Sequence, residues 1–346
     1  MYKVIQLEGH DSGEFTMDQS RLKTVSSIKK ITEYDDYNLY TMDIEYDYNI
    51  DRIIDSWNGN DASLVNSILN EAVPGIPIKI EVPQFGCTAF STDVGNSVFM
   101  GRNYDFKRDT SAMMVKCHPN KGLASLAFCA LDNLSVKNPL NSESDRATCL
   151  ASPFVCLDGI NEKGVSIAVL TLDSQPTKQN TGKKKISTSL AIRIVLDNAS
   201  SVDEAVELFK QYDMIANAGR DYHFFVSDPS GQSVSVEYDC DSQDRPLITT
   251  HTFVLTNFFS IHENMVVPNQ KNGPYGHGKE RFDTVINELG TDSPDVWKAL
   301  RDSSQSPDPD DITSNTQWSI AFNNTNPSAE ICLRRHWNDR FTFTLT

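Results

Sequence analysis

The hydrophobic pattern of the chain changes at residue 87. Beyond it, short apolar-rich segments separated by turn residues are typical of β-strands. Two pairs of segments predict hairpins, one over 154–172 that turns at 161–164 and one over 222–238 that turns at 228–231. The other predicted strands are 98–105, 113–118, 123–131, 252–256, 317–322 and 330–345. Long hairpins of this kind indicate antiparallel sheets.

Helical signals lie between these hairpins. Residues 189–198 carry an apolar stripe, Ser201 to Glu204 form a capping box that opens a helix to Tyr212, and residues 279–289 form a helix that ends at Gly290. Paired helices between antiparallel hairpins predict an α+β architecture with sheets inside and helices outside.

The first 86 residues have a different character. Residues 34–48 are rich in Asp and Tyr, 50–57 and 62–73 predict short helices, and Pro74-Gly75-Ile76-Pro77 breaks the pattern. We interpret 1–86 as a leading segment and 87–346 as the catalytic domain.

Composition narrows the classes of partner. The 346 residues carry 31 basic and 47 acidic side chains, a net charge of -16, which disfavours nucleic acid and anionic membranes as partners. The N-terminus lacks a run of signal-peptide length, and the chain lacks an 18-residue apolar stretch without charges, so we expect a cytoplasmic protein that does not cross a membrane. Its seven cysteines include no CxxC pair and predict free thiols.

Cofactor signals are weak throughout. The histidines at 251, 262 and 277 lack metal-ligand spacing, and the sequence contains no phosphate-binding loop and no Gly-x-Ser-x-Gly elbow. We therefore expect neither a metal nor a cofactor.

Cys87 is the most informative candidate, because it follows Gly86 and begins a predicted hairpin. A four-residue loop over 93–96 places Cys87 opposite Arg102, whose charge would lower the thiol pKa. A two-residue Gly95-Asn96 turn pairs Cys87 with Tyr104 instead. Asp105 lies three residues beyond Arg102, so the strand needs a bend near 103–104 if both side chains serve one site. A lone cysteine at a strand start is more often part of the core.

Five sequence pieces occur in the order found in one enzyme family. They are Gly86-Cys87-Thr88, Gly101-Arg102-Asn103-Tyr104-Asp105, residues 158–164 (DGINEKG), Val254-Leu255-Thr256-Asn257 and Gly278-Lys279-Glu280-Arg281-Phe282. With them the chain resembles the choloylglycine hydrolase family of linear-amide hydrolases. This resemblance implies the N-terminal nucleophile hydrolase fold, an αββα sandwich in which antiparallel sheets lie between helix layers.

The resemblance also assigns roles to individual residues. Cys87 resembles the nucleophile, Arg102 its charged neighbour, Asp105 the carboxylate that orients the Cys87 α-amine, and Arg281 a second active-site arginine. Asn257 resembles the side-chain donor to the oxyanion. Thr171 stands where bile salt hydrolases carry an asparagine whose backbone N–H also donates to it. The long segment before Cys87 is closer to penicillin acyltransferase and acid-ceramidase-like relatives.

The expected activity is hydrolysis of a small N-acyl amide after the chain has cut itself between Gly86 and Cys87. Three alternatives stay open: an acyltransferase that passes the acyl group to an amine, an unprocessed homologue that binds an acyl ligand without turnover, and a papain-like protease. The last needs a histidine base and lacks its cysteine-flanking signature. A homo-oligomer is compatible with the sequence.

Overall fold

The structure is a computed structural model that describes residues 3–5, 15–73, 86–106, 108–271, 273–309 and 314–345. One sheet contains β3 (Lys29–Lys30), β4 (Leu39–Ile44), β7 (Ala112–Cys117), β8 (Ser125–Ala130), β9 (Asp158–Asn161), β10 (Ser166–Leu172), β13 (Asp221–Ser227), β14 (Ser233–Tyr238) and β15 (Leu247–His251). Its order is β15-β14-β13-β10-β9-β8-β7-β4-β3. The second sheet contains β5 (Gly86–Val94), β6 (Ser97–Asp105), β16 (Val254–Leu255), β19 (Thr316–Asn323), β20 (Ser328–Leu333) and β21 (Arg340–Thr344), in the order β16-β5-β6-β19-β20-β21.

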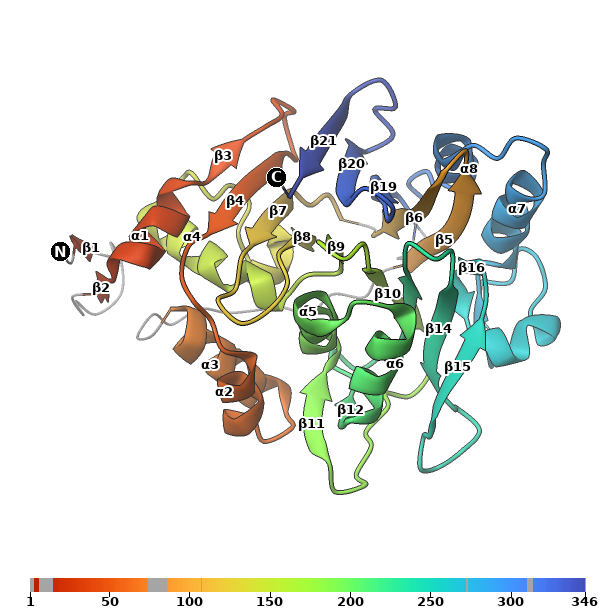
Figure 1. Ribbon diagram of the computed structural model, residues 1–346, viewed down its shortest axis with the longest axis horizontal. Helices are drawn as coiled ribbons and strands as arrows, with labels where there is room; N and C mark the ends of the chain where they lie inside the picture. Colours follow the sequence, from red (N-terminus) through yellow and green to blue (C-terminus); the bar gives the residue numbers. More distant parts are fainter. Residues whose placement is uncertain are drawn as a thin grey trace.

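Helices cover the outer faces of these two sheets (Figure 1). Helices α5 (Thr188–Asn198) and α6 (Val202–Lys210) pack on the nine-stranded sheet, whereas α7 (Lys279–Leu289) and α8 (Val296–Asp302) pack on the six-stranded sheet. The sheets contact each other through β10 and β5. The predicted layered α+β arrangement is therefore confirmed.

The described part of the leading segment belongs to the same core. It contributes α1 (Gln19–Ser26), α2 (Ile50–Ser56), α3 (Asp61–Ala72) and strands β3 and β4, and β4 pairs in parallel with β7. Its apolar side chains at Ile53, Ile54, Leu64, Ile68 and Leu69 are buried. Helices α2 and α3 match the helices predicted over 50–57 and 62–73. The predicted break at residues 74–77 lies outside the described residues.

The predicted register of the Cys87 hairpin is wrong. Strands β5 and β6 pair up to Val94 and Ser97, so the turn is the two-residue Gly95-Asn96, and Gly95 has the positive φ of 62° that such turns require. Cys87 consequently lies opposite Tyr104, and Arg102 lies opposite Ala89. The expected irregularity is also displaced, because the register shift occurs in β19, between Thr316 and Trp318, rather than in β6.

The remaining elements refine the prediction. The segment 330–345 forms two strands, β20 and β21, and the helix from Ser201 ends at Lys210. After it, β12 (Tyr212–Ile215) pairs in parallel with β11 (Lys184–Ser187). The smaller elements are β1 (Lys3–Ile5), β2 (Phe15–Met17), α4 (Glu143–Thr148), β17 (Asn257–Phe258), β18 (Gly276–His277) and the 3-10 helices η1 (Leu131–Leu134), η2 (Cys149–Phe154) and η3 (Ser260–Met265). None of the described helices has the length and apolar character of a membrane span.

Candidate active site

Cys87 lies at the beginning of β5, between the two sheets, and its side chain is fully buried. Burial raises the pKa of its thiol to about 12, while the charge and hydrogen bond of Arg102 and the backbone N–H of Asp105 act in the opposite direction. The expectation that Arg102 brings the thiol pKa below its ordinary value is therefore wrong for the uncleaved chain, because the loss of hydration outweighs the guanidinium. The thiol is protonated at neutral pH.

Arg102 is held against the thiol by three further contacts. Its Nη1 and Nη2 donate to the carbonyl oxygens of Asn103 and Val169 at 2.8 and 2.9 Å, and its Nε donates to Oδ2 of Asp158 at 3.3 Å. Asp158 and Arg102 are both fully buried. Burial raises the pKa of Asp158 to about 6, against the effect of Arg102. Asp158 was part of a family motif in the sequence, but its contact with Arg102 was not predicted.

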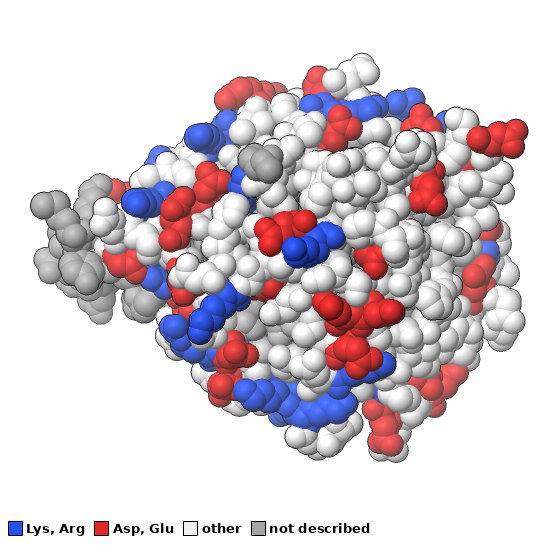
Figure 2. Space-filling model, viewed as in Figure 1, with Lys and Arg blue, Asp and Glu red and all other residues white. Residues whose placement is uncertain are grey.

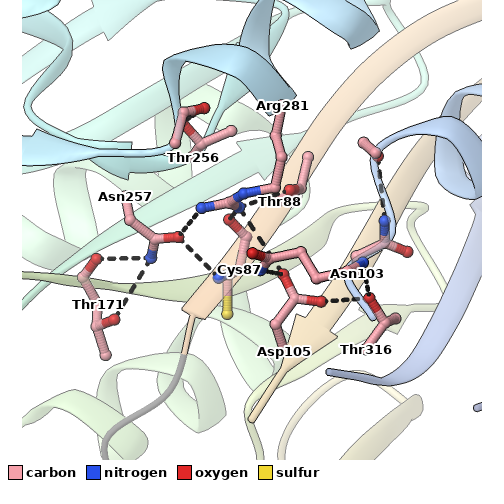
Figure 3. A network of polar contacts seen from close by, with 12 residues as sticks. Cys87, Thr88, Asn103, Asp105, Thr171, Thr256, Asn257, Arg281 and Thr316 are labelled. Atoms are coloured by element: carbon pink, nitrogen blue, oxygen red, sulfur yellow. Dashed lines mark hydrogen bonds and ion pairs between the residues drawn. The ribbon is translucent and has the colours of Figure 1, made fainter. Parts of the chain in front are cut away.

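Asp105 lies three residues beyond Arg102 on β6 and so points to the opposite face of the strand, with its carboxylate close to Cys87 (Figure 3). It accepts hydrogen bonds from Thr316 Oγ1 at 2.6 Å and Gln305 Nε2 at 2.7 Å, and it lies 3.8 Å from Arg281 Nη1. Burial raises the pKa of Asp105, whereas Arg281 and these hydrogen bonds act to lower it. A buried, hydrogen-bonded carboxylate is thus available near the Cys87 backbone.

Asn257 and Arg281 hold the backbone of Cys87. The Cys87 N–H donates to Oδ1 of Asn257 at 2.9 Å, and Arg281 Nη1 donates to the Cys87 carbonyl. Arg281 also donates to Asn257 Oδ1 at 2.8 Å and to Thr88 Oγ1 at 2.9 Å. Arg281 approaches so closely that a Cβ at Gly278 would lie 2.4 Å from its Nη2, and Gly278 has a φ of 94°. Glycine at this position therefore lets α7 begin beside the site.

Thr171 contacts the same network from β10. Its carbonyl oxygen accepts a hydrogen bond from Asn257 Nδ2 at 2.8 Å, and its Oγ1 lies 3.4 Å from the same nitrogen. The structure thus brings all six predicted site residues to one place: Cys87, Arg102, Asp105, Thr171, Asn257 and Arg281. They come from β5, β6, β10, β17 and α7, so residues distant in sequence converge where the two sheets meet.

Outside this site, three neighbouring side chains are of types that can ligate a metal ion. The ligand atoms of Cys240, Asp241 and His262 lie within 4.8 Å of one another, and these three are the one such group among the residues that the structure describes. His262 Nε2 lies 3.0 Å from Asp241 Oδ2, and the Asp241 side chain is 56% exposed, as expected of a polar contact at the surface. This cluster was not predicted, because Cys240 and Asp241 are adjacent in the chain but His262 follows 21 residues after Asp241, a spacing that is not typical of metal ligands.

Comparison with known proteins supplies further findings. A family model described as acyl-coenzyme A:6-aminopenicillanic acid acyl-transferase matches residues 92–337, beginning just beyond Cys87. A penicillin V acylase of Pectobacterium atrosepticum is 35% identical over 92 residues, which cover 23% of this chain and 24% of that protein. The chain therefore matches about a quarter of the length of this relative.

Two solved structures share the overall fold. Penicillin V acylase from Agrobacterium tumefaciens aligns with a TM-score of 0.53 and 20% identity, over 75% of this chain and 86% of that one. A variant of conjugated bile acid hydrolase from Clostridium perfringens aligns with a TM-score of 0.53 and 19% identity, over 75% of this chain and 92% of that one.

Proposed function

Because this chain belongs to the acyl-coenzyme A:6-aminopenicillanic acid acyl-transferase family and has the N-terminal nucleophile hydrolase fold, we propose that it is a self-processing cysteine amidase. Its substrate is a small linear N-acyl amide. The proposal depends above all on the contacts of Cys87: Asn257 holds its N–H, Arg281 its carbonyl, and Arg102 its thiol. Residues from three elements thus orient one cysteine at the beginning of a strand.

The first reaction cuts the chain between Gly86 and Cys87. The Cys87 sulfur attacks the Gly86 carbonyl carbon, the thiol proton passes to the Cys87 nitrogen, and the C–N bond breaks to leave a thioester. Water then adds its hydroxyl to the Gly86 carbonyl and returns a proton to the sulfur. Glycine suits the scissile position because it has no Cβ and tolerates strained backbone angles. Arg102 assists by favouring the thiolate against the effect of burial.

Cleavage converts the Cys87 N–H into an α-amine. Such an amine has an unperturbed pKa of about 7.7 to 8.0, so it can accept the proton of its own thiol at neutral pH. The amine keeps Asn257 Oδ1 as its hydrogen-bond acceptor, and the buried Asp105 carboxylate orients it. One residue then supplies both nucleophile and base.

In turnover the Cys87 sulfur attacks the substrate carbonyl. The negative charge that develops on the carbonyl oxygen is stabilised by Asn257 Nδ2 and the backbone N–H of Thr171, and one such donor contributes on the order of 3 kcal/mol. The nitrogen leaves as an amine after taking up the thiol proton. Water then attacks the acyl-enzyme and releases the carboxylic acid.

Acyl transfer is the second candidate, because the matching family model is named for an acyltransferase. In that case an amine rather than water attacks the acyl-enzyme. A third alternative is an uncleaved protein that binds an acyl ligand without turnover. These alternatives differ in measurable products.

Intact mass spectrometry and N-terminal sequencing test the cleavage. We expect two fragments, the second beginning Cys-Thr-Ala-Phe, and a single chain for Cys87→Ala. Cleavage that persists in Cys87→Ala would contradict self-processing. A panel of N-acyl amino acids, N-acylethanolamines, bile salt conjugates and penicillins, each with and without an added amine, then separates hydrolysis from transfer. A cleaved protein inactive on the whole panel would contradict the proposed amidase activity.

A further inference from the structure

A buried histidine and a buried glutamate contact the backbone on either side of Asn257. His223 on β13 and Glu237 on β14 are both fully buried, with His223 Nδ1 at 2.8 Å from Glu237 Oε1. The neighbouring Phe224 packs on Phe209 of α6, on the outer face of the sheet. Because successive side chains of a strand alternate between faces, His223 points inward, toward the six-stranded sheet.

This pair holds both ends of the segment that carries Asn257. His223 Nε2 lies 2.8 Å from the carbonyl oxygen of Thr256, and the N–H of Ser260 donates to both oxygens of Glu237, at 2.8 and 3.0 Å. Asn257 therefore lies between two backbone groups fixed by one side-chain pair. Thr256 Oγ1 also donates to the carbonyl of Gly278 at 3.1 Å, which links the segment to the start of α7.

The hydrogen bonds determine how many protons the pair holds. The Thr256 carbonyl can only accept, so His223 Nε2 carries a hydrogen. The contact between His223 Nδ1 and Glu237 needs a second hydrogen, since otherwise two acceptors would face each other. The pair thus holds both hydrogens and has no net charge. An apolar pair of similar size would avoid the desolvation of these groups, but it could not hold a carbonyl and an N–H in fixed directions.

We propose that His223 and Glu237 are positioning residues that set the place of the Asn257 amide through Thr256 and Ser260. Neither residue touches the reacting atoms in this assignment. The inference rests on the proposed function, in which Asn257 donates to the oxyanion.

Kinetics of variants provide the first test. In His223→Phe we expect kcat per cleaved chain to fall about 10²-fold, the effect of a small misplacement of a catalytic group, with KM unchanged. Glu237→Gln should retain most of the activity, because the glutamine amide can donate to Nδ1 of a neutral His223 and its oxygen can accept from Ser260. His251→Phe is the matched control, since His251 is exposed at the edge strand of the same sheet. Equal kcat values for His223→Phe and wild type would overturn the inference.

A double-mutant cycle separates positioning from general destabilisation. If His223 acts only through Asn257, His223→Phe lowers kcat much less in an Asn257→Ala background than in the wild type. Full additivity of the two losses would contradict the inference.

A spectroscopic measurement needs no turnover. With asparagine-selective ¹⁵N labelling, the side-chain amide signal of Asn257, identified by its loss in Asn257→Ala, should shift or broaden in His223→Phe and stay in place in Glu237→Gln. An unchanged signal in a folded His223→Phe protein would overturn the inference. Absence of amide hydrolysis by the wild type would instead count against the proposed function alone.

Discussion

Arg102 is the diagonal neighbour of Cys87 in the β5–β6 ladder. Cys87 lies opposite Tyr104, while Arg102 lies opposite Ala89, two residues further along β5. Residues two apart on a strand point to the same face, and a long side chain spans the diagonal distance. The predicted four-residue loop shifted the register by two residues, which preserves the face of every side chain. A wrong register therefore still predicted the right neighbour for the thiol.

Replacing Arg102 should change the reactivity of the cysteine. In Arg102→Gln the thiol loses the charge that favours its thiolate form, so the thiol pKa rises and the pH profile of alkylation moves to higher pH. Rates of iodoacetamide modification of the cleaved protein measure this shift. Arg301→Gln, at an exposed position of α8, is the matched control. An unchanged profile in Arg102→Gln would contradict the role assigned to the guanidinium.

The leading segment should remain bound after cleavage. Its buried residues Ile53, Ile54, Leu64 and Ile68 would each lose roughly 1.5 to 3 kcal/mol if exposed, and β4 would leave β7 unpaired along one edge. Native gel filtration is expected to give one peak that contains both fragments, and denaturant should separate them. Recovery of a soluble second fragment alone under native conditions would contradict this prediction.

Helices α2, α3, α5, α6 and α7 were predictable because their signals are local, whereas α1, α4 and α8 were not predicted. The capping box at Ser201 and the stop at Gly290 correspond to the observed start of α6 and end of α7. Strand β4 was missed within a segment rich in Asp and Tyr, because its pairing partner β7 lies much further along the chain. Parallel pairing of this kind leaves no turn signal in the sequence.

The site was predictable only where residue order matched a family. Motifs led to five of the predicted site residues and a count from Asn161 led to Thr171, whereas the contacts of Asp158, His223 and Glu237 depend on which strands are neighbours in the sheet. We also overestimated how far Arg102 lowers the thiol pKa of Cys87, because the sequence does not show that Cys87 is buried. Desolvation is set by the whole fold.

Asp158 predicts an unusual dependence of stability on pH. Burial raises the pKa of the Asp158 carboxyl in the folded state to about 6, from its ordinary value of 3.8. The folded state then binds more protons than the unfolded state between about pH 4 and 6, so Asp158 makes folding less favourable as pH rises through this window. A pKa change of this size corresponds to about 3 kcal/mol at most.

The Asp158→Asn variant removes this contribution. Relative to wild type, the variant should therefore gain stability from pH 4 to pH 7: its free energy of unfolding minus that of the wild type should rise by up to about 3 kcal/mol, as measured by urea titration. Asp203→Asn is the control, because Asp203 is exposed in the first turn of α6. A change of the opposite sign would mean that Arg102 outweighs burial at Asp158.

Asn257 has two separable functions in this site. Its Oδ1 accepts from the Cys87 N–H and from Arg281, while its Nδ2 donates to Thr171 and is the proposed oxyanion donor. Asn257→Asp keeps the acceptor and removes the donor. We expect Arg281 and the Cys87 nitrogen to remain bound to the aspartate, and kcat to fall on the order of 10²- to 10³-fold, as for loss of one oxyanion donor.

Thr171→Ala is the matched comparison for Asn257→Asp, because the oxyanion contact assigned to Thr171 comes from its backbone N–H. This variant removes only Thr171 Oγ1, which lies 3.4 Å from Asn257 Nδ2, and leaves both backbone groups in β10. Its kcat should therefore stay close to that of the wild type, while Asn257→Asp loses activity. Steady-state kinetics on the cleaved proteins measure the difference. A loss in Thr171→Ala equal to that in Asn257→Asp would show that the hydroxyl, rather than the backbone, acts in the site.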